Sequence, residues 1–264
     1  MTCKNCDTLL NSEQHYCYEC GAKVIKNRLT TKNLFSEFSE QFLSYDNKFL
    51  ITFFDLFRKP ESVIHGYITG TRKKYINVIQ YLAISLTLLG LQLFILNKFY
   101  PDFFAAAYTD FGNYFAMYPE NTRVEAKKFM SNYLAFINEY QSLVYIIGIP
   151  FTAIVTYFAF RKEKLLNYIE HVVVNTYLTA QYVVFTFFLY LIFAVLNLNV
   201  NVLINISLVL YLFYYGFVFY RIYKLRVTTI FLRFLLSLAI LGVMFLIVLT
   251  LGIIIGIVYL KFLK

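Results

Sequence analysis

Long uncharged stretches of hydrophobic residues fill the chain from about residue 75 to its end. A helix that crosses a membrane needs about 20 apolar residues, and five stretches approach or exceed this length. They are residues 76–96, 143–160, 172–196, 202–220 and 234–260. This pattern predicts an all-α polytopic membrane protein with about five transmembrane helices, which together form a domain over residues 76–264.

The segment before the first span has helical periodicity instead. From Leu34 to Phe57, apolar residues recur at steps of three and four, which predicts a helix with one apolar face. Such a helix lies either in the membrane interface or against the other helices from the cytosolic side, and the pattern fits both. Pro60 predicts the start of a second short helix and Gly70 its end. Residues 28–75 are therefore expected to be a linker followed by juxtamembrane amphipathic helices.

The first 27 residues are polar and hold all four cysteines of the chain, as Cys3-x2-Cys6 and Cys17-x2-Cys20. Two close thiol pairs separated by ten residues are typical of a short zinc ribbon. A site of four thiolates has no open coordination position, so the predicted ion is a structural Zn²⁺ that folds its peptide. A substitute role for His15 as a ligand, or a redox role for either pair, is less well supported by this spacing.

The charges predict an orientation. Thiolates that hold zinc need a reducing compartment, so the N-terminus is expected in the cytosol. Of 24 Lys and Arg residues, 18 lie in residues 1–75, 161–171 and 221–233, the segments that this orientation places in the cytosol. Such a bias follows the positive-inside rule and favours contact with anionic membrane lipids over binding to nucleic acid. Five crossings place the C-terminus, with Lys261 and Lys264, on the outer side.

The connections between the spans follow from the same orientation. The Lys98–Ser142 segment mixes charges of both signs and is expected to be an outer loop. Residues 103–118 within it are apolar but interrupted by Asp110, Gly112 and Asn113, so they are expected outside the bilayer core. The uncharged Asn197–Asn201 turn is also expected to face outward.

The run DNKFLITFFDLFRKPESVIHGYITGTRKKY, residues 46–75, resembles a family of bacterial membrane proteins that is found mainly in Bacteroidota and catalogued as domain of unknown function 3667. The resemblance rests on Thr52, the Arg58-Lys59-Pro60 step and the Gly66–Tyr75 segment. It is extended by the cysteine-rich start, the number of spans and the Glu170-His171 pair. Thr71 and Val78 depart from the pattern, where Lys and Pro are expected. The resemblance implies a multi-pass protein of the bacterial inner (plasma) membrane and no particular reaction.

Two further groups of residues are candidate sites. Arg72, Lys73 and Lys74 adjoin the first span, where they either bind lipid headgroups or only mark the cytosolic side. Glu170, His171 and Asn175 lie at the cytosolic end of the third span, and His171 and Asn175 share a helix face. They form either part of a metal or proton-handling site or hydrogen bonds between helices.

The third span is also the most polar one. Asn175, Thr176, Thr179 and Gln181 are residues that usually join helices in membranes. Gly252-x3-Gly256 in the last span permits close approach of another helix.

No nucleotide-binding, esterase or metalloprotease motif is present, and no charged residue lies inside a predicted span. We therefore expect no catalytic residues and favour a non-enzymatic adaptor or scaffold whose zinc ribbon binds a cytosolic or membrane protein. A transporter or channel-like component with a polar third span is the first alternative, and a lipid-handling membrane enzyme is the second. A homo-oligomer is compatible with each.

Overall fold

The computed structural model describes residues 1–11, 13–22, 24, 30, 48–71, 73–101, 103 and 119–262. The chain divides into two compact units, Met1–Lys48 and Phe49–Lys264. In the first unit, an antiparallel bridge joins Thr2 to Leu9. Its small core is formed by Cys3, Leu10 and Cys17, with Cys6, Ala22 and Val24 packed against them.

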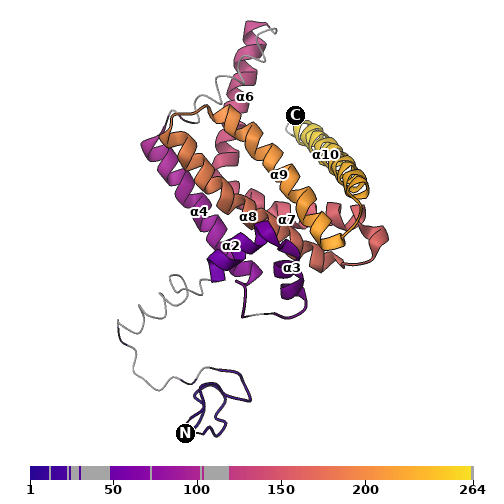
Figure 1. The fold of residues 1–264 in the computed structure, drawn as a ribbon. Helices are drawn as coiled ribbons and strands as arrows, with labels where there is room; N and C mark the ends of the chain where they lie inside the picture. The colour runs from indigo at the N-terminus through magenta and orange to yellow at the C-terminus, as the bar shows by residue number, and fades with distance from the viewer. Residues whose placement is uncertain are drawn as a thin grey trace. The chain divides into compact units, whose positions relative to one another are not determined.

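The second unit is helical throughout its described elements (Figure 1). The elements are α2 (Lys48–Arg58), α3 (Pro60–Ile68), α4 (Val78–Phe99), α6 (Glu120–Glu139), α7 (Gln141–Ala159), the short 3-10 helix η1 (Arg161–Glu163), α8 (Tyr168–Val195), α9 (Val200–Tyr223) and α10 (Val227–Phe262). Five of them, α4, α7, α8, α9 and α10, are long and apolar enough to cross a membrane. The predicted fold class is thereby confirmed, and the chain is a multi-pass membrane protein.

Helix α8 is the centre of the bundle. Half of the residues in its most apolar stretch are buried, against 28% in α4, α7 and α9 and 11% in α10. It packs on α4 along one side and on α7 and α9 along others, while α10 contacts α7 and α9 at the edge of the bundle. In Figure 1 the orange helices α8 and α9 accordingly run between α4 and the yellow α10. A polar side chain on α8 therefore has neighbours from several helices.

Helices α2 and α3 pack against one end of the bundle (Figure 1). Leu56 of α2 and Val63 and Ile64 of α3 are fully buried in the same core as Tyr81 and Tyr177. Of the two positions that the amphipathic pattern allowed, residues 48–58 thus take the one against the other helices. The earlier part of the predicted helix, residues 34–47, lies outside the described residues.

The second short helix starts and stops as expected. Pro60 is its first residue, where a missing N–H costs nothing because that group would have no helical partner. Beyond its end, Gly70 has φ +102°, a conformation that only glycine adopts readily.

The segment between α4 and α7, which the sequence pattern predicted to be a loop, contains a helix. Helix α6 covers Glu120–Glu139, and Pro119 at its N-cap position marks where it begins. It has no continuous apolar stretch, so it lacks the pattern of a membrane span. The apolar residues 104–118 before it lie outside the described part of the chain.

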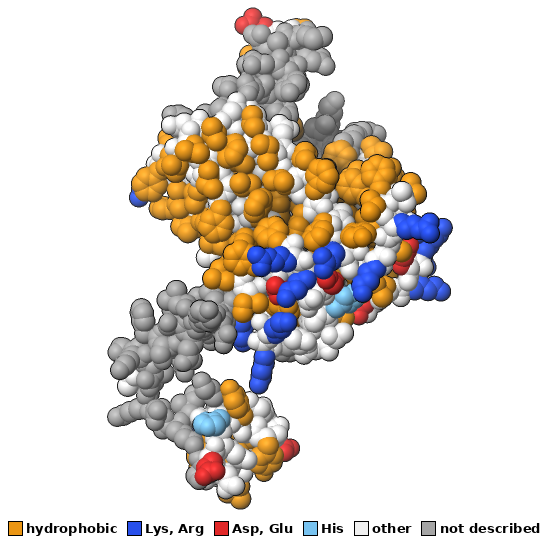
Figure 2. All heavy atoms as spheres, viewed as in Figure 1, with side chains coloured by type: hydrophobic (Ala, Val, Ile, Leu, Met, Phe, Trp, Pro, Cys, Tyr) orange, Lys and Arg blue, Asp and Glu red, His pale blue; other side chains and the backbone are white. Residues whose placement is uncertain are grey.

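Ion pairs join the segments at the α2–α3 end of the bundle. Arg221 of α9 binds Glu61 of α3 at 2.5 Å, and Arg233 of α10 binds Glu163 of η1 at 2.7 Å. Figure 2 shows the result on one face: hydrophobic side chains cover the bundle, and Lys and Arg side chains gather below them. This border is where a membrane headgroup layer is expected.

Candidate functional site

The four cysteines of the first unit form one cluster. Their sulfur atoms all lie within 4.8 Å of one another. Cys3 Sγ is 3.7 Å from Cys20 Sγ, and Cys6 Sγ is 3.6 Å from Cys17 Sγ. A tetrahedral zinc ion with Zn–S bonds of about 2.3 Å would separate its sulfurs by about 3.8 Å. The cluster therefore fits the geometry of a metal such as zinc.

Each cysteine pair sits on a turn of the same construction. The N–H of Asp7 donates to the carbonyl of Cys3 at 2.9 Å, and the N–H of Gly21 donates to that of Cys17 at 2.9 Å. Each first cysteine also donates its own N–H at 2.8 Å, Cys3 to Thr8 and Cys17 to Ala22. The repeated turn presents two sulfurs from each half of the unit to one point.

Hydrogen bonds and burial shift the pKa values of two of the thiols in opposite directions. The backbone N–H of Ala22, followed by the side chains of Asn5 and Cys6, stabilises the thiolate of Cys20 and lowers its pKa to about 6. The backbone N–H of Cys20 favours the Cys17 thiolate, but burial and the neighbouring thiols outweigh it and raise the Cys17 pKa to about 11. Without a cation the cluster thus retains protons, and a divalent ion would displace them.

Exposed side chains surround this cluster. Leu9 is 76% exposed and Tyr18 is 66% exposed, and each adjoins a cysteine turn. His15 is also exposed and lies outside the sulfur cluster, as the two complete thiol pairs predict.

The basic residues before the first span are only partly described. Arg72 lies outside the described residues, while Lys73 and Lys74 are exposed. The Lys74 ammonium lies 5.1 Å from the centre of the Tyr75 ring. Tyr75 in turn donates its hydroxyl to Asp55 at 2.9 Å, and burial together with this carboxylate raises the pKa of Tyr75 to about 12.

Glu170 belongs to the start of α8. Its backbone N–H donates to the side chain of Asn167 at 2.9 Å, and its carboxylate accepts from the N–H of Asn167 at 2.7 Å. This is a capping box, which satisfies two backbone donors at the helix start. The structure does not bring Glu170 and His171 together as a pair.

His171 lies in a buried hydrogen-bond network of α7, α8 and α9. The Thr156 hydroxyl donates to the carbonyl of Ala153 at 3.1 Å, so its oxygen accepts from His171 Nδ1 and Asn175 Nδ2, each at 2.9 Å. The Tyr223 hydroxyl then donates to Nε2 of His171 at 3.1 Å. Both ring nitrogens are thereby engaged, which leaves neither to bind a metal or to accept a proton from a ligand.

Other polar residues of α8 also hold elements together. Gln181 donates to the carbonyl of Phe53 at 3.0 Å and accepts a hydrogen bond from Tyr81. The Thr176 hydroxyl donates to the carbonyl of Val172 in its own helix at 2.7 Å. Of the four polar residues singled out in this span, Thr179 lines a cavity between α7, α8 and α9, and Gln181 lines a second one beside Phe57 and Tyr214. Gly252-x3-Gly256 falls in a part of α10 whose side-chain surroundings lie outside the description.

Thr52, one of the residues that carry the family resemblance, joins α2 to the segment just before α4. The buried Thr52 accepts the N–H of Ile76 through its hydroxyl oxygen at 3.0 Å. Tyr177 of α8 donates to the carbonyl of Ile76 at 2.9 Å. None of these partners was predicted from the sequence, because nothing local indicates which segments become neighbours.

Comparison with known proteins agrees with this part of the chain. A family model described as "Protein of unknown function (DUF3667)" matches residues 46–90, which include α2, α3 and the first half of α4. The resemblance predicted from residues 46–75 is confirmed there. No curated protein and no solved structure matches the chain.

Proposed function

We propose that this multi-pass protein is a non-enzymatic adaptor of the bacterial inner membrane, and that its N-terminal unit is a cytosolic zinc ribbon that binds a protein partner. The observation that carries the proposal is the closed set of four thiols at Cys3, Cys6, Cys17 and Cys20. Four thiolates complete a tetrahedral zinc shell, so the ion would fold the ribbon and have no position for substrate.

The surface of the ribbon supports a role in binding. Leu9 and Tyr18 expose most of their apolar surface, in a unit whose own core contains few side chains. Aromatic side chains are enriched in protein interfaces because they bury large areas with little loss of conformational freedom. A partner that covers them would exclude water from both cysteine turns.

The charge distribution supports the orientation. Arg58, Lys59, Arg161, Arg221 and Arg233 lie at the end of the bundle that carries α2 and α3. Basic residues near short loops are retained in the cytosol during insertion. This end, from which the chain leads back to the ribbon, would therefore face the cytosol.

The alternatives have less support in the described residues. A transport path along α8 would need free polar groups, and Asn175 and Gln181 are engaged in hydrogen bonds between elements. A lipid-handling enzyme would need His171 as an acid or base, and both of its ring nitrogens bind other side chains of the protein.

The test is affinity purification from solubilised membranes with three forms of the full chain. We compare the wild type, Cys17→Ser and the double variant Leu9→Ser/Tyr18→Ser, and measure zinc per chain together with the proteins retained. The wild type should retain one zinc ion and a defined partner, Cys17→Ser should lose both, and the double variant should keep zinc but lose the partner. Retention of the same proteins by all three would refute the proposal.

A further inference from the structure

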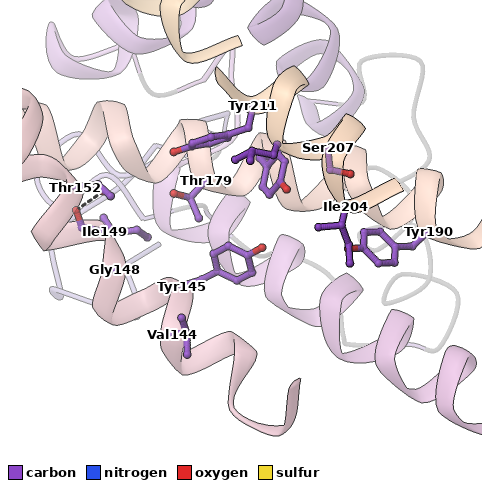
Figure 3. Close-up of a pocket in the computed structure, with 12 residues that line it drawn as sticks. Val144, Tyr145, Gly148, Ile149, Thr152, Thr179, Tyr190, Ile204, Ser207 and Tyr211 are labelled. Carbon is purple, nitrogen blue, oxygen red and sulfur yellow. Dashed lines mark hydrogen bonds between the residues drawn. The ribbon is translucent and has the colours of Figure 1, made fainter. Parts of the chain in front are cut away.

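A cavity of about 410 Å³ lies between α7, α8 and α9 (Figure 3). Its lining residues are Val144, Tyr145, Gly148, Ile149 and Thr152 of α7, Thr179, Tyr182 and Tyr190 of α8, and Ile204, Ser207, Leu208 and Tyr211 of α9. This volume is within the range of pockets that bind small molecules. The sequence pattern did not reveal it, because tyrosine is common throughout this chain.

The lining combines hydroxyl groups with apolar surface and contains no Asp, Glu, Lys, Arg or His. Four tyrosines, two threonines and one serine contribute hydroxyls, each of which can both donate and accept. Figure 3 shows these side chains reaching the same space from three helices. A charged ligand would find no counter-ion here, and burying an unpaired charge is costly.

Ser207 adds an unsatisfied polar atom. The residue is 2% exposed, and its hydroxyl has no hydrogen-bond partner. Serine in a membrane helix can bond to a carbonyl one turn earlier, as Ser237 does with Arg233 at 2.9 Å. A buried hydroxyl without a partner is unfavourable, so a ligand that supplied the missing bond from within the cavity would be favoured there.

The depth of the cavity limits what can reach it. Thr179 lies eleven residues after the start of α8, which is about 16 Å along the helix and about half the thickness of the hydrocarbon core. Exposed apolar side chains such as Ile146 and Ile147 flank the site on α7. A ligand at this depth is expected to enter from the lipid.

We infer that this cavity binds an uncharged lipid-soluble molecule whose head carries hydroxyl or carbonyl oxygens. Tyr145, Thr179 and Tyr211 would hydrogen-bond those oxygens, and Ser207 would gain its missing partner. Aliphatic side chains such as Val144 and Leu208 would contact the apolar part. Both a glyceride and a quinone have this chemistry, and the site would exclude the phosphorylated form of the same glyceride.

Two glycines provide matched variants. Gly148 lines the hydroxyl-bearing cavity, and Gly216 lines a pocket between α9 and α10 in which Tyr220 is the one lining residue with a hydroxyl. A Cβ added at either position meets nothing within 4 Å, so a leucine can enter both without clash at its first carbon. Gly148→Leu therefore fills the proposed site, and Gly216→Leu fills only the control pocket.

The experiment measures equilibrium binding to the full chain in detergent with radiolabelled dioctanoylglycerol, decyl-naphthoquinone and dioctanoyl phosphatidic acid. At least one of the uncharged probes should bind and identify the source, and phosphatidic acid should bind at least tenfold more weakly. Gly148→Leu should weaken binding at least tenfold, and Gly216→Leu should leave it unchanged. Ser207→Ala, a smaller change, should weaken it by about two- to tenfold, the effect of one hydrogen bond.

Three results would overturn the inference: no binding of either uncharged probe, equal binding of phosphatidic acid, or an equal loss in Gly216→Leu and Gly148→Leu. Circular dichroism and gel filtration of each variant establish that it is folded. This result can be told apart from a failure of the adaptor proposal, because the partner-binding test changes residues of the first unit and the binding experiment changes residues of the second.

Discussion

Asp7 and Gly21 occupy the same position in the two cysteine turns, and both have positive φ, 57° and 68°. Glycine adopts this conformation without steric cost, whereas a residue with a Cβ is strained there by about 1 kcal/mol, and somewhat less for Asp. The first turn therefore carries a strain that the second avoids.

We predict that Asp7→Gly stabilises the metal-bound ribbon by up to about 1 kcal/mol and that Gly21→Ala destabilises it by about 1 kcal/mol. Because folding and metal binding are coupled, each change shows as a shift in the chelator concentration that removes half of the zinc. A shift of Gly21→Ala in the same direction as Asp7→Gly would contradict the backbone argument.

Acid is expected to release the metal, because protons compete with it for the thiolates. The Cys20 pKa is lowered to about 6. Above that pH this thiol has already lost its proton. Below that pH the metal must displace one more proton than it does above it. The apparent zinc affinity should thus fall with decreasing pH, and more steeply below pH 6, when measured by chelator competition between pH 5 and 8. A slope that stays constant over this range would argue against the lowered Cys20 pKa.

The buried network around His171 allows a test of what holds α7 to α8 and α9. Thr156→Val keeps the volume but removes the oxygen that accepts from His171 and Asn175. Leaving these buried donors unpaired should cost about 1–3 kcal/mol of stability, measured by thermal unfolding in detergent. Thr152→Val is the control, because its hydroxyl bonds only to Ile149 of its own helix. Equal losses of stability in the two variants would show that the network does not stabilise the packing of these helices.

At the scale of the element, α2 is held by side chains of the bundle at its C-terminal end. The last carbonyls of a helix have no partner within it. Here Tyr214 of α9 donates to the carbonyl of Leu56 at 3.2 Å, and Arg221 donates to that of Arg58 at 3.1 Å. Gln181 of α8 adds its bond to Phe53. These bonds explain why α2 packs on the bundle rather than lying free in the interface.

Removing Gln181 should loosen this attachment. Gln181→Leu leaves the Tyr81 hydroxyl without its partner and should speed amide hydrogen exchange in residues 49–58 about tenfold or more, the effect of 1.4 kcal/mol or more. Tyr220→Phe, on an exposed side of α9, is the matched control and should change nothing there. Unchanged exchange in Gln181→Leu would show that apolar packing alone holds α2.

The features that could be predicted from the sequence are those that depend on residues close together in the chain. The cysteine spacing places Cys3, Cys6, Cys17 and Cys20 within one short segment, and uncharged length identifies the five spans. Helix α6 escaped prediction because its residues mix polar and apolar types without a long apolar run. The partners of Gln181 lie 128 and 100 residues away, and no periodicity indicates such pairings.

At the scale of the whole molecule, if all five candidate spans cross the membrane, Met1 and Lys264 lie on opposite sides of it. With the proposed cytosolic N-terminus, a reporter that works only in the cytosol should be active when fused before Met1, and a reporter that works only outside it should be active when fused after Lys264. Fusions in the Asn197–Asn201 turn, which also should lie outside, provide the control for the C-terminal result. Both ends on one side would mean that one of the five helices does not cross.

The oxidation state of the four cysteines also depends on the compartment in which the N-terminal unit lies. Cys3 and Cys20, and likewise Cys6 and Cys17, lie close enough that losing the metal in an oxidising environment would cross-link the two turns. If the N-terminus is cytosolic as proposed, chains inserted the wrong way round would carry disulfides that correctly inserted chains lack. Differential thiol alkylation of whole membranes could then count misinserted molecules without any tag.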